Sequence, residues 1–231
     1  MSETLNSQLS ILNYLALPES CRLGKRVYKK LFHENAKLGV TDRKAFRDDI
    51  DTIWWQFTLK PSTTPVQAYA DDEREYLEIA VLQVDLKTQK RIARIAEIIH
   101  RAVPYPVLLV FCFGAACAVS MAHKRFSLAE KNALVAEDIV VSEWIDLSTP
   151  TPAQLAFLDS LALGGLPQTD FFTLYSAFVD RVVALACARL SGEFRLEKDA
   201  DALEARRQLL ARCHSLEVEI AEERALLGKE T

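Results

Sequence analysis

The chain has 231 residues, of which 50% are hydrophobic and 26% are charged, and its formal net charge is −4 at pH 7. These values fit one large globular domain, or a domain with an appendage, and they exclude a protein coated in basic charge. The five cysteines lack metal-binding spacing, and residues 1–20 lack a basic region ahead of their apolar part. We therefore expect reduced thiols, no secretory signal and a cytoplasmic location.

The first predicted element is a helix over residues 20–38, where apolar side chains recur at helical spacing. The pattern then changes to alternation, which predicts strands over residues 50–59 and 76–86. Residues 60–74 are rich in Pro, Ser, Thr and acids and are expected to form a loop, so the two strands most simply pair antiparallel. A helix over about residues 88–102 follows, with its isoleucines facing inward.

The next segment, residues 103–122, carries no charged side chain. A membrane-spanning helix needs about 20 apolar residues to cross roughly 30 Å of hydrocarbon. Pro104 and Pro106 disfavour helix ahead of Val107, which leaves about 16 residues, or roughly 24 Å of helix. Valine and phenylalanine are frequent up to Gly114, where a turn is expected. We predict two adjacent buried strands here and no membrane crossing.

A last strand is predicted over residues 139–147, and the composition changes at the STPTP stretch that follows it. Pro152 marks the start of a helix, and Asp170 is a capping residue for a longer, strongly apolar helix. The remainder, from about residue 197 to residue 227, is charged and is predicted to be helical. From the last strand onward the pattern therefore predicts helices alone.

This order of elements predicts an α+β fold. We expect residues 1–147 to form a core domain, with a mixed or antiparallel sheet of about five strands and flanking helices. Residues 148–231 are expected to form a helical C-terminal arm. An apolar seam on the last helix would pack within the chain or form a coiled coil with another copy, and it consists of Leu209, Cys213, Leu216, Ile220 and Leu227.

Asp51 and the triplet Asp85-Leu86-Lys87 form the sharpest candidate site. If the two predicted strands pair symmetrically about their loop, position 51 lies across from about position 85. An aspartate that faces a D-x-K triplet is the arrangement of the PD-(D/E)xK nucleases, in which carboxylates hold a divalent cation such as Mg²⁺ and the lysine helps to activate water. D-x-K also arises by chance, strand ends often carry solvated charges, and the first strand of that fold is not evident in the sequence.

Basic residues cluster near the N-terminus, and a second basic group follows closely. Such residues can neutralise the phosphates of a nucleic acid, or they can form the solvated face of an amphipathic helix. Asp42, Asp48 and Asp49 lie among them and dilute the positive charge. The candidate nucleic-acid contacts are Lys25, Arg26, Lys29, Lys30, Arg43 and Lys44.

Three segments carry a family resemblance, namely IDTIWWQFTLKPSTTPV, EIAVLQVDLK and IHRAVPYPVLLVF. With its Trp-containing strand, a strand that ends in Leu-Lys, a Pro-Tyr-Pro strand start and a helical tail, nearly the whole chain resembles the bacterial domain-of-unknown-function family DUF4391. Val103 stands where the family pattern has isoleucine, and the tail lacks a clear match to the family's C-terminal pattern. The resemblance supplies no catalytic residue, but it implies a genetic neighbourhood of helicases and DNA methyltransferases in DNA-modification or phage-defence clusters.

We therefore expect a non-catalytic accessory protein of a bacterial DNA-modification or phage-defence assembly. Its expected partners are proteins such as a helicase or a DNA methyltransferase, together with DNA that is contacted through the basic cluster. The alternative is an enzyme, a Mg²⁺-dependent PD-(D/E)xK-like nuclease in which Asp51 and Asp85 hold the metal and Lys87 completes the catalytic set. No cofactor is expected except Mg²⁺ under this alternative.

Overall fold

The computed structural model describes residues 10–35, 38–127, 134–197 and 199–227, and it confirms the predicted α+β fold class. Part of the N-terminal segment considered above for a secretory signal lies outside these residues. The main sheet has seven strands, where the sequence predicted about five. They are β1 (Arg22–Arg26), β2 (Ile50–Leu59), β5 (Ile79–Leu86), β6 (Val107–Phe113), β7 (Ala116–Phe126), β8 (Leu134–Val141) and β9 (Ile145–Asp146).

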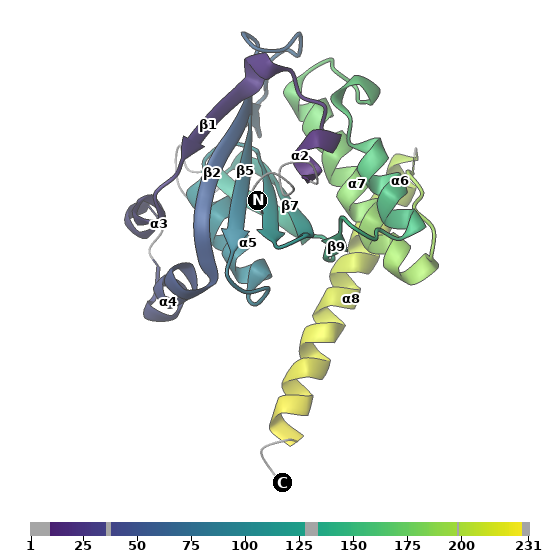
Figure 1. Ribbon diagram of the computed structural model, residues 1–231. Coiled ribbons are helices and arrows are strands. Elements are labelled where there is room, and N and C mark those ends of the chain that lie inside the picture. Colours follow the sequence, from purple (N-terminus) through teal and green to yellow (C-terminus); the bar gives the residue numbers. More distant parts are fainter. Residues whose placement is uncertain (1–9, 36–37, 128–133, 198, 228–231) are drawn as a thin grey trace.

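Neighbouring strands follow the order β1-β2-β5-β6-β7-β8, and β9 pairs with β7 (Figure 1). All of these pairs are antiparallel except β5 and β6, which run parallel because helix α5 (Ile92–Ala102) connects them. The carboxyl ends of β5 and β6 therefore lie at one end of the sheet and their amino ends at the other. A separate short hairpin consists of β3 (Tyr69–Ala70) and β4 (Glu75–Tyr76).

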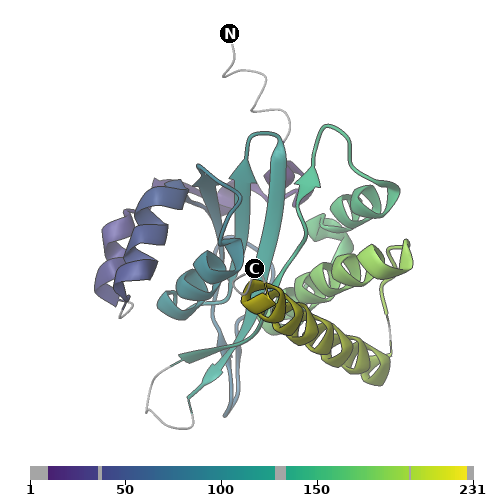
Figure 2. The same cartoon turned by 90° about the horizontal axis from the view of Figure 1, so that it is seen from below.

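Helices cover both faces of the sheet (Figure 1, Figure 2). One apolar core lies between the sheet and a first group of helices, and a second core lies between the sheet and α5 with a second group. The first group is α2 (Ile11–Tyr14), α6 (Pro152–Ser160) and α7 (Phe171–Ser191), and the second is α3 (Lys29–Asn35) and α4 (Val40–Asp49). Two short 3₁₀ helices are η1 (Glu19–Cys21) and η2 (Leu163–Gly165).

The helices that follow residue 148 divide into two kinds. Helices α6 and α7 share a core with the sheet, whereas α8 (Ala200–Leu227) leaves the body and carries the chain away from it (Figure 1, Figure 2). Among the described residues, α7 is the one helix whose length and apolar composition would allow it to cross a membrane, and 56% of its most apolar window is buried. The contact of α7 with the sheet accounts for this apolar composition.

Local sequence signals correctly placed several elements. The segment from Val107 onward forms the β6–β7 hairpin, and Gly114 takes a φ of +59° in its two-residue turn, as the first position of a tight hairpin turn requires. Thr151 and Gln154 form a capping box at the start of α6. The carboxylate of Asp170 accepts a hydrogen bond from the backbone N–H of Thr173 and so caps α7.

The predicted helix over residues 20–38 is wrong. The chain forms the edge strand β1 there, and α3 begins only at Lys29. Gly24 takes a φ of +59° where the β1–β2 register shifts, a backbone conformation that no helix contains. The helical spacing of Leu23 and Leu31 was misleading, because these side chains are 38% and 48% exposed. Pairing with β2 overrides the local apolar period.

Candidate functional site

The carboxyl ends of β5 and β6 open onto a cavity of about 280 Å³, and we call this region the open end of the sheet. Asp85 on β5 and Cys112 on β6 are cross-strand neighbours, and both line the cavity. The lining mixes polar and apolar groups, which is typical of sites that bind small ligands. The remaining walls include Ser10, Ile11, Gln83, Gly114, Ala115 and Leu147.

A chain of side-chain hydrogen bonds holds Asp85 in place. The hydroxyl of Thr52 donates to Oδ2 of Asp85 at 2.5 Å, and Nε2 of Gln83 donates to Oδ1 at 2.6 Å. The indole N–H of Trp54 donates to Thr52, and the amide of Gln56 donates to Gln83 at 2.9 Å. A carboxylate offers about four lone-pair sites. Asp85 is therefore fixed in orientation and keeps acceptor capacity toward the cavity.

The sequence suggested that Asp51 lies across from Asp85, and the structure shows that it does not. A register shift follows Ile50, so Thr52 is the residue opposite Asp85 and Asp51 is the extra residue of the bulge. Asp51 and Lys87 are both exposed, and neither lines the cavity. Of the three proposed nuclease residues, Asp85 alone thus lines the cavity. The described part of the chain contains no group of three or more His, Cys, Asp or Glu that could hold a metal ion.

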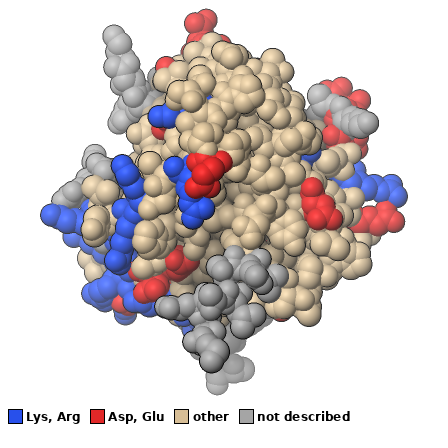
Figure 3. Space-filling view, turned by 45° about the horizontal axis from the view of Figure 1, so that its top comes forward, with Lys and Arg blue, Asp and Glu red and all other residues tan. Residues whose placement is uncertain are grey.

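The six candidate cations lie on three neighbouring elements, β1, α3 and α4, and not on one helix. The space-filling view shows Lys and Arg gathered on this side of the molecule, at the left of Figure 3. Five of the six are exposed, and Lys29 is half-buried, where its Nζ donates to the carbonyl of Ile50 at 2.5 Å. We call this surface the basic flank, and it consists of Lys25, Arg26, Lys29, Lys30, Arg43 and Lys44.

Positive charges converge around Lys29. Burial lowers the pKa of its ammonium group, and the nearby charge of Lys87 lowers this pKa further. Asp51 acts in the opposite direction and Arg26 adds to the lowering. The net effect is a lowered pKa, because burial and the two positive charges together outweigh the one nearby acid. Lys87 thus extends the positive charge of the basic flank toward the end of β5.

The acids that seemed to dilute the basic flank are paired with arginines outside it. Asp42 binds Arg94 at 2.7 Å, and this hydrogen bond lowers the pKa of the Asp42 carboxyl. Asp49 is buried and binds Arg91 through both carboxylate oxygens, at 2.5 and 2.7 Å. Asp48 likewise binds Arg47. These three acids therefore offset the charges of Arg47, Arg91 and Arg94, and the cations of the basic flank keep their excess positive charge.

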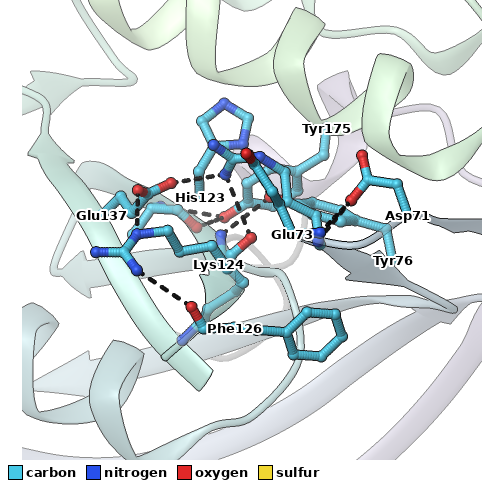
Figure 4. Close-up of polar contacts among 11 residues, drawn as sticks. Asp71, Glu73, Tyr76, His123, Lys124, Phe126, Glu137 and Tyr175 are labelled. Atoms are coloured by element: carbon cyan, nitrogen blue, oxygen red, sulfur yellow. Dashed lines mark hydrogen bonds and ion pairs between the residues drawn. The ribbon is translucent and has the colours of Figure 1, made fainter. Parts of the chain in front are cut away.

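We call the opposite end of the sheet the closed end. It holds a second polar cluster (Figure 4). Tyr76 is fully buried, its hydroxyl contacts Nδ1 of His123 at 2.9 Å, and it accepts a hydrogen bond from the backbone N–H of Lys124. The side chain of Lys124 is also buried, and its Nζ donates to the carbonyls of His100 and Val103 at the end of α5. A cation at a helix carboxyl end is favourable, so Lys124 caps α5.

Tyr175 joins β6 to β7 at the closed end. Its hydroxyl contacts the carbonyls of Val107 and Ala122 at 2.8 and 3.0 Å and accepts from the N–H of Ala122 at 3.1 Å. The directly paired residues of β6 and β7 begin two positions further along, at Leu109 and Ser120. The phenol thus replaces ladder hydrogen bonds where the two strands no longer pair directly. Burial raises the pKa of Tyr175, as it raises that of Tyr76 to about 12.

An ion-pair group lies beside the closed end. Glu137 binds Arg74 and Arg125, each at 2.6 Å, and these two arginines lower the pKa of its carboxyl even though burial opposes them. The guanidinium of Arg74 also lies 5.7 Å from the ring centre of Phe172. Except for Nδ1 of His100, which has no hydrogen-bond partner among the described residues, the buried polar groups at this end use partners within the chain, which indicates a structural role.

Sequence reasoning missed most of the residues that define both ends. Gln83 could have been found, because strand alternation places it on the same face as Asp85. Tyr76, His123 and Tyr175 gave no local signal, since the residues that their hydrogen bonds join are 47 to 68 positions apart in the chain.

The geometry defines a class of protein: an α+β protein with a mixed seven-stranded sheet, a basic edge and a polar cavity at the open end. The family model described as "Domain of unknown function (DUF4391)" matches residues 15–231, and the chain belongs to this family. The resemblance noted in the sequence is thereby confirmed. No curated protein and no solved structure is significantly similar to the chain.

Proposed function

We propose that this protein is a non-catalytic accessory protein that binds DNA through the basic flank, within a bacterial DNA-modification or phage-defence assembly. One observation carries the proposal: cations on β1, α3 and α4 gather on one surface, while Asp42, Asp48 and Asp49 pair with other arginines. Such a surface neutralises phosphates and releases counterions. The family resemblance supports the setting, since it implies a neighbourhood of helicases and DNA methyltransferases that would supply the protein partners.

Edge protection is the competing explanation for part of this charge. Lysines and arginines on an edge strand prevent it from pairing with other chains, and β1 is an edge strand whose five residues are all exposed. This explanation accounts for Lys25 and Arg26. It does not account for Arg43 and Lys44, which lie on α4 and protect no strand. The cations of α4 are therefore the sharper test of DNA binding.

The experiment is a titration of fluorescent duplex DNA followed by anisotropy, at salt concentrations from about 50 to 200 mM. We expect the affinity to fall steeply with salt. A plot of the logarithm of the binding constant against the logarithm of the salt concentration should have a slope of about −0.9 for each phosphate contact. Arg43→Glu/Lys44→Glu should weaken binding by on the order of tenfold and reduce this slope by one to two contacts. A matched control is Lys60→Glu/Arg101→Glu, which makes the same charge change with exposed residues away from the flank.

The control variant should bind within about twofold of the original protein. Absence of binding at 50 mM salt would refute the proposal. So would equal weakening by the flank variant and the control, because binding would then follow the net charge and not the surface.

A second candidate, the Mg²⁺-dependent nuclease, is favoured by the strand order. The first strand of the PD-(D/E)xK fold was not evident in the sequence, and the structure has an antiparallel strand, β1, beside β2. Helix α5 and the parallel strand β6 then follow β5 in the expected order. The donor set fits less well, because Asp51 is displaced from Asp85 by the bulge and lies outside the cavity lining. For this reason the nuclease ranks second.

Cleavage assays distinguish the two functions. A nuclease should cut plasmid DNA with Mg²⁺ or Mn²⁺, and Asp85→Asn should abolish the cleavage while Asp159→Asn, an exposed aspartate on α6, should not. DNA binding without cleavage, in both metals, would support the accessory protein and remove the second candidate.

A further inference from the structure

Helix α8 presents an apolar stripe to solvent. The helix contacts the body along its first half, where Leu210 lies against the core and Arg206 reaches Glu197 at 3.3 Å. Further along, it extends away from the rest of the chain (Figure 1, Figure 2). Leu209, Leu216 and Ile220 are 66%, 40% and 49% exposed. Together they form one face of a helix that nothing in the described chain covers.

This stripe belongs to a seam with the spacing of a coiled coil. The intervals between successive seam positions along α8 alternate between four and three residues. This spacing keeps the positions on one side of a slightly supercoiled helix. Two of the positions are charged, Arg206 toward the start and Glu223 toward the end. They stand at equal distances from the midpoint of the seam, between residues 214 and 215. The seam extends the five apolar residues identified in the sequence, Leu209, Cys213, Leu216, Ile220 and Leu227, by three further positions, Ala202, Arg206 and Glu223.

We infer that α8 pairs with α8 of a second copy of this chain, in antiparallel orientation. In an antiparallel pair centred between residues 214 and 215, Leu209 lies opposite Ile220 of the second copy, and Cys213 lies opposite Leu216. Arg206 lies opposite Glu223 in the same register. Apolar seam positions then face apolar residues, and charged positions face the opposite charge. Because of the twofold axis, each contact occurs twice.

Charge complementarity decides the orientation. A parallel pair would place Arg206 against Arg206 and Glu223 against Glu223, and like charges in the seam are destabilising. The antiparallel pair replaces both repulsions with two opposite-charge contacts. Arg212 and Glu219, which are exposed and flank the seam, also face each other across the antiparallel pair. In the single chain, Arg206 contacts Glu197 at a long distance, and both side chains are partly exposed. Replacing this contact by one with Glu223 of the second copy therefore costs little.

The test is a charge-exchange cycle read by sedimentation velocity on the full chain, from about 1 to 100 µM. We expect the original protein to form a dimer of two 26.0 kDa chains. Glu223→Arg and Arg206→Glu should each raise the dimer dissociation constant by at least about tenfold, because each places like charges face to face. The double variant Arg206→Glu/Glu223→Arg should return it to within about threefold of the original.

A parallel pair predicts a different result, because neither single exchange removes an attraction and the double variant rescues nothing. The matched control is Glu222→Arg, which makes the same charge change one position off the seam and should leave the dissociation constant within about threefold. A monomer at 100 µM would overturn the inference. A dimer that responds equally to Glu222→Arg and Glu223→Arg, or that the double exchange does not restore, would overturn it as well. Thermal unfolding of each variant checks that the body is intact.

Discussion

The two ends of the main sheet treat buried polar groups in opposite ways. At the closed end, Tyr76, Lys124 and Tyr175 are 0 to 2% exposed and bond to partners within the chain. At the open end, Asp85 faces a cavity of about 280 Å³ with acceptor capacity that the described residues do not use. Fully partnered buried groups specify a fold, whereas polar groups that face a cavity can receive a ligand.

Aromatic packing explains why one end closes. Phe172 of α7 stacks on Tyr69 at 5.0 Å between ring centres and meets Tyr76 edge-on at 5.2 Å, so the β3–β4 hairpin is held against the sheet. The open end has instead the tight β6–β7 turn and the short helix α2 around its cavity. The same sheet thus has one end stabilised by large side chains and one end left accessible.

The largest predicted effect concerns His100, a buried residue at the closed end whose backbone carbonyl accepts from Lys124. Burial lowers the pKa of its imidazole to about 3, and the charge of Lys124 adds to this effect. In the unfolded chain the pKa is near 6.5. Below pH 6.5 the unfolded chain binds a proton that the folded chain does not, so stability falls as the pH drops. Between pH 7 and pH 4, His100 should account for about 3 kcal/mol of lost unfolding free energy.

The measurement is urea unfolding of the original protein and of His100→Gln at both pH values. Both proteins share all carboxylates, so their protonation cancels in the comparison. The variant should lose about 3 kcal/mol less than the original protein. Equal losses would show that the closed end admits a proton, and the contrast between the two ends would then fail.

A smaller effect is expected from Tyr175→Phe. The change removes the hydroxyl that accepts from the buried N–H of Ala122 and bridges β6 to β7. A buried donor without a partner costs about 1–3 kcal/mol, so we expect a loss of about 2 kcal/mol of unfolding free energy. Tyr69→Phe is the matched control, since its exposed hydroxyl contacts Asp71 and should contribute less than about 0.5 kcal/mol. Similar losses of unfolding free energy in the two variants would mean that a buried hydroxyl at the closed end stabilises the fold no more than an exposed one.

The two ends also differ from the rest of the fold in how far the sequence predicts them. The β6–β7 hairpin and the starts of α6 and α7 follow from local chemistry, because Pro106, Gly114, Thr151 and Asp170 act within a few residues of their own positions. These elements were predicted, and the structure confirms them. Strand β5 beside the cavity was likewise predicted, from alternation.

What failed depends on partners far away in the sequence. Strand β1 exists because β2 offers an edge, and its own residues favoured a helix by their spacing. The bulge at Asp51 moves the register by one residue, which no period in β2 reveals. The closed end combines side chains from the residues before β5, from β7 and from α7, as with Tyr76, His123 and Tyr175. Such a cluster is specified by the packing of the whole chain.

The smallest predicted effect tests the open end itself. Asp85→Asn keeps the size of the side chain and still accepts from Thr52, while the cavity can admit water to the other groups. We therefore expect the free energy of unfolding to change by less than about 1 kcal/mol. Urea unfolding at pH 7 is the measurement, with Tyr175→Phe as the reference. A loss of 2 kcal/mol or more would make Asp85 a structural residue like those of the closed end, and its hydrogen bonds with Thr52 and Gln83 would then serve the fold and not a ligand.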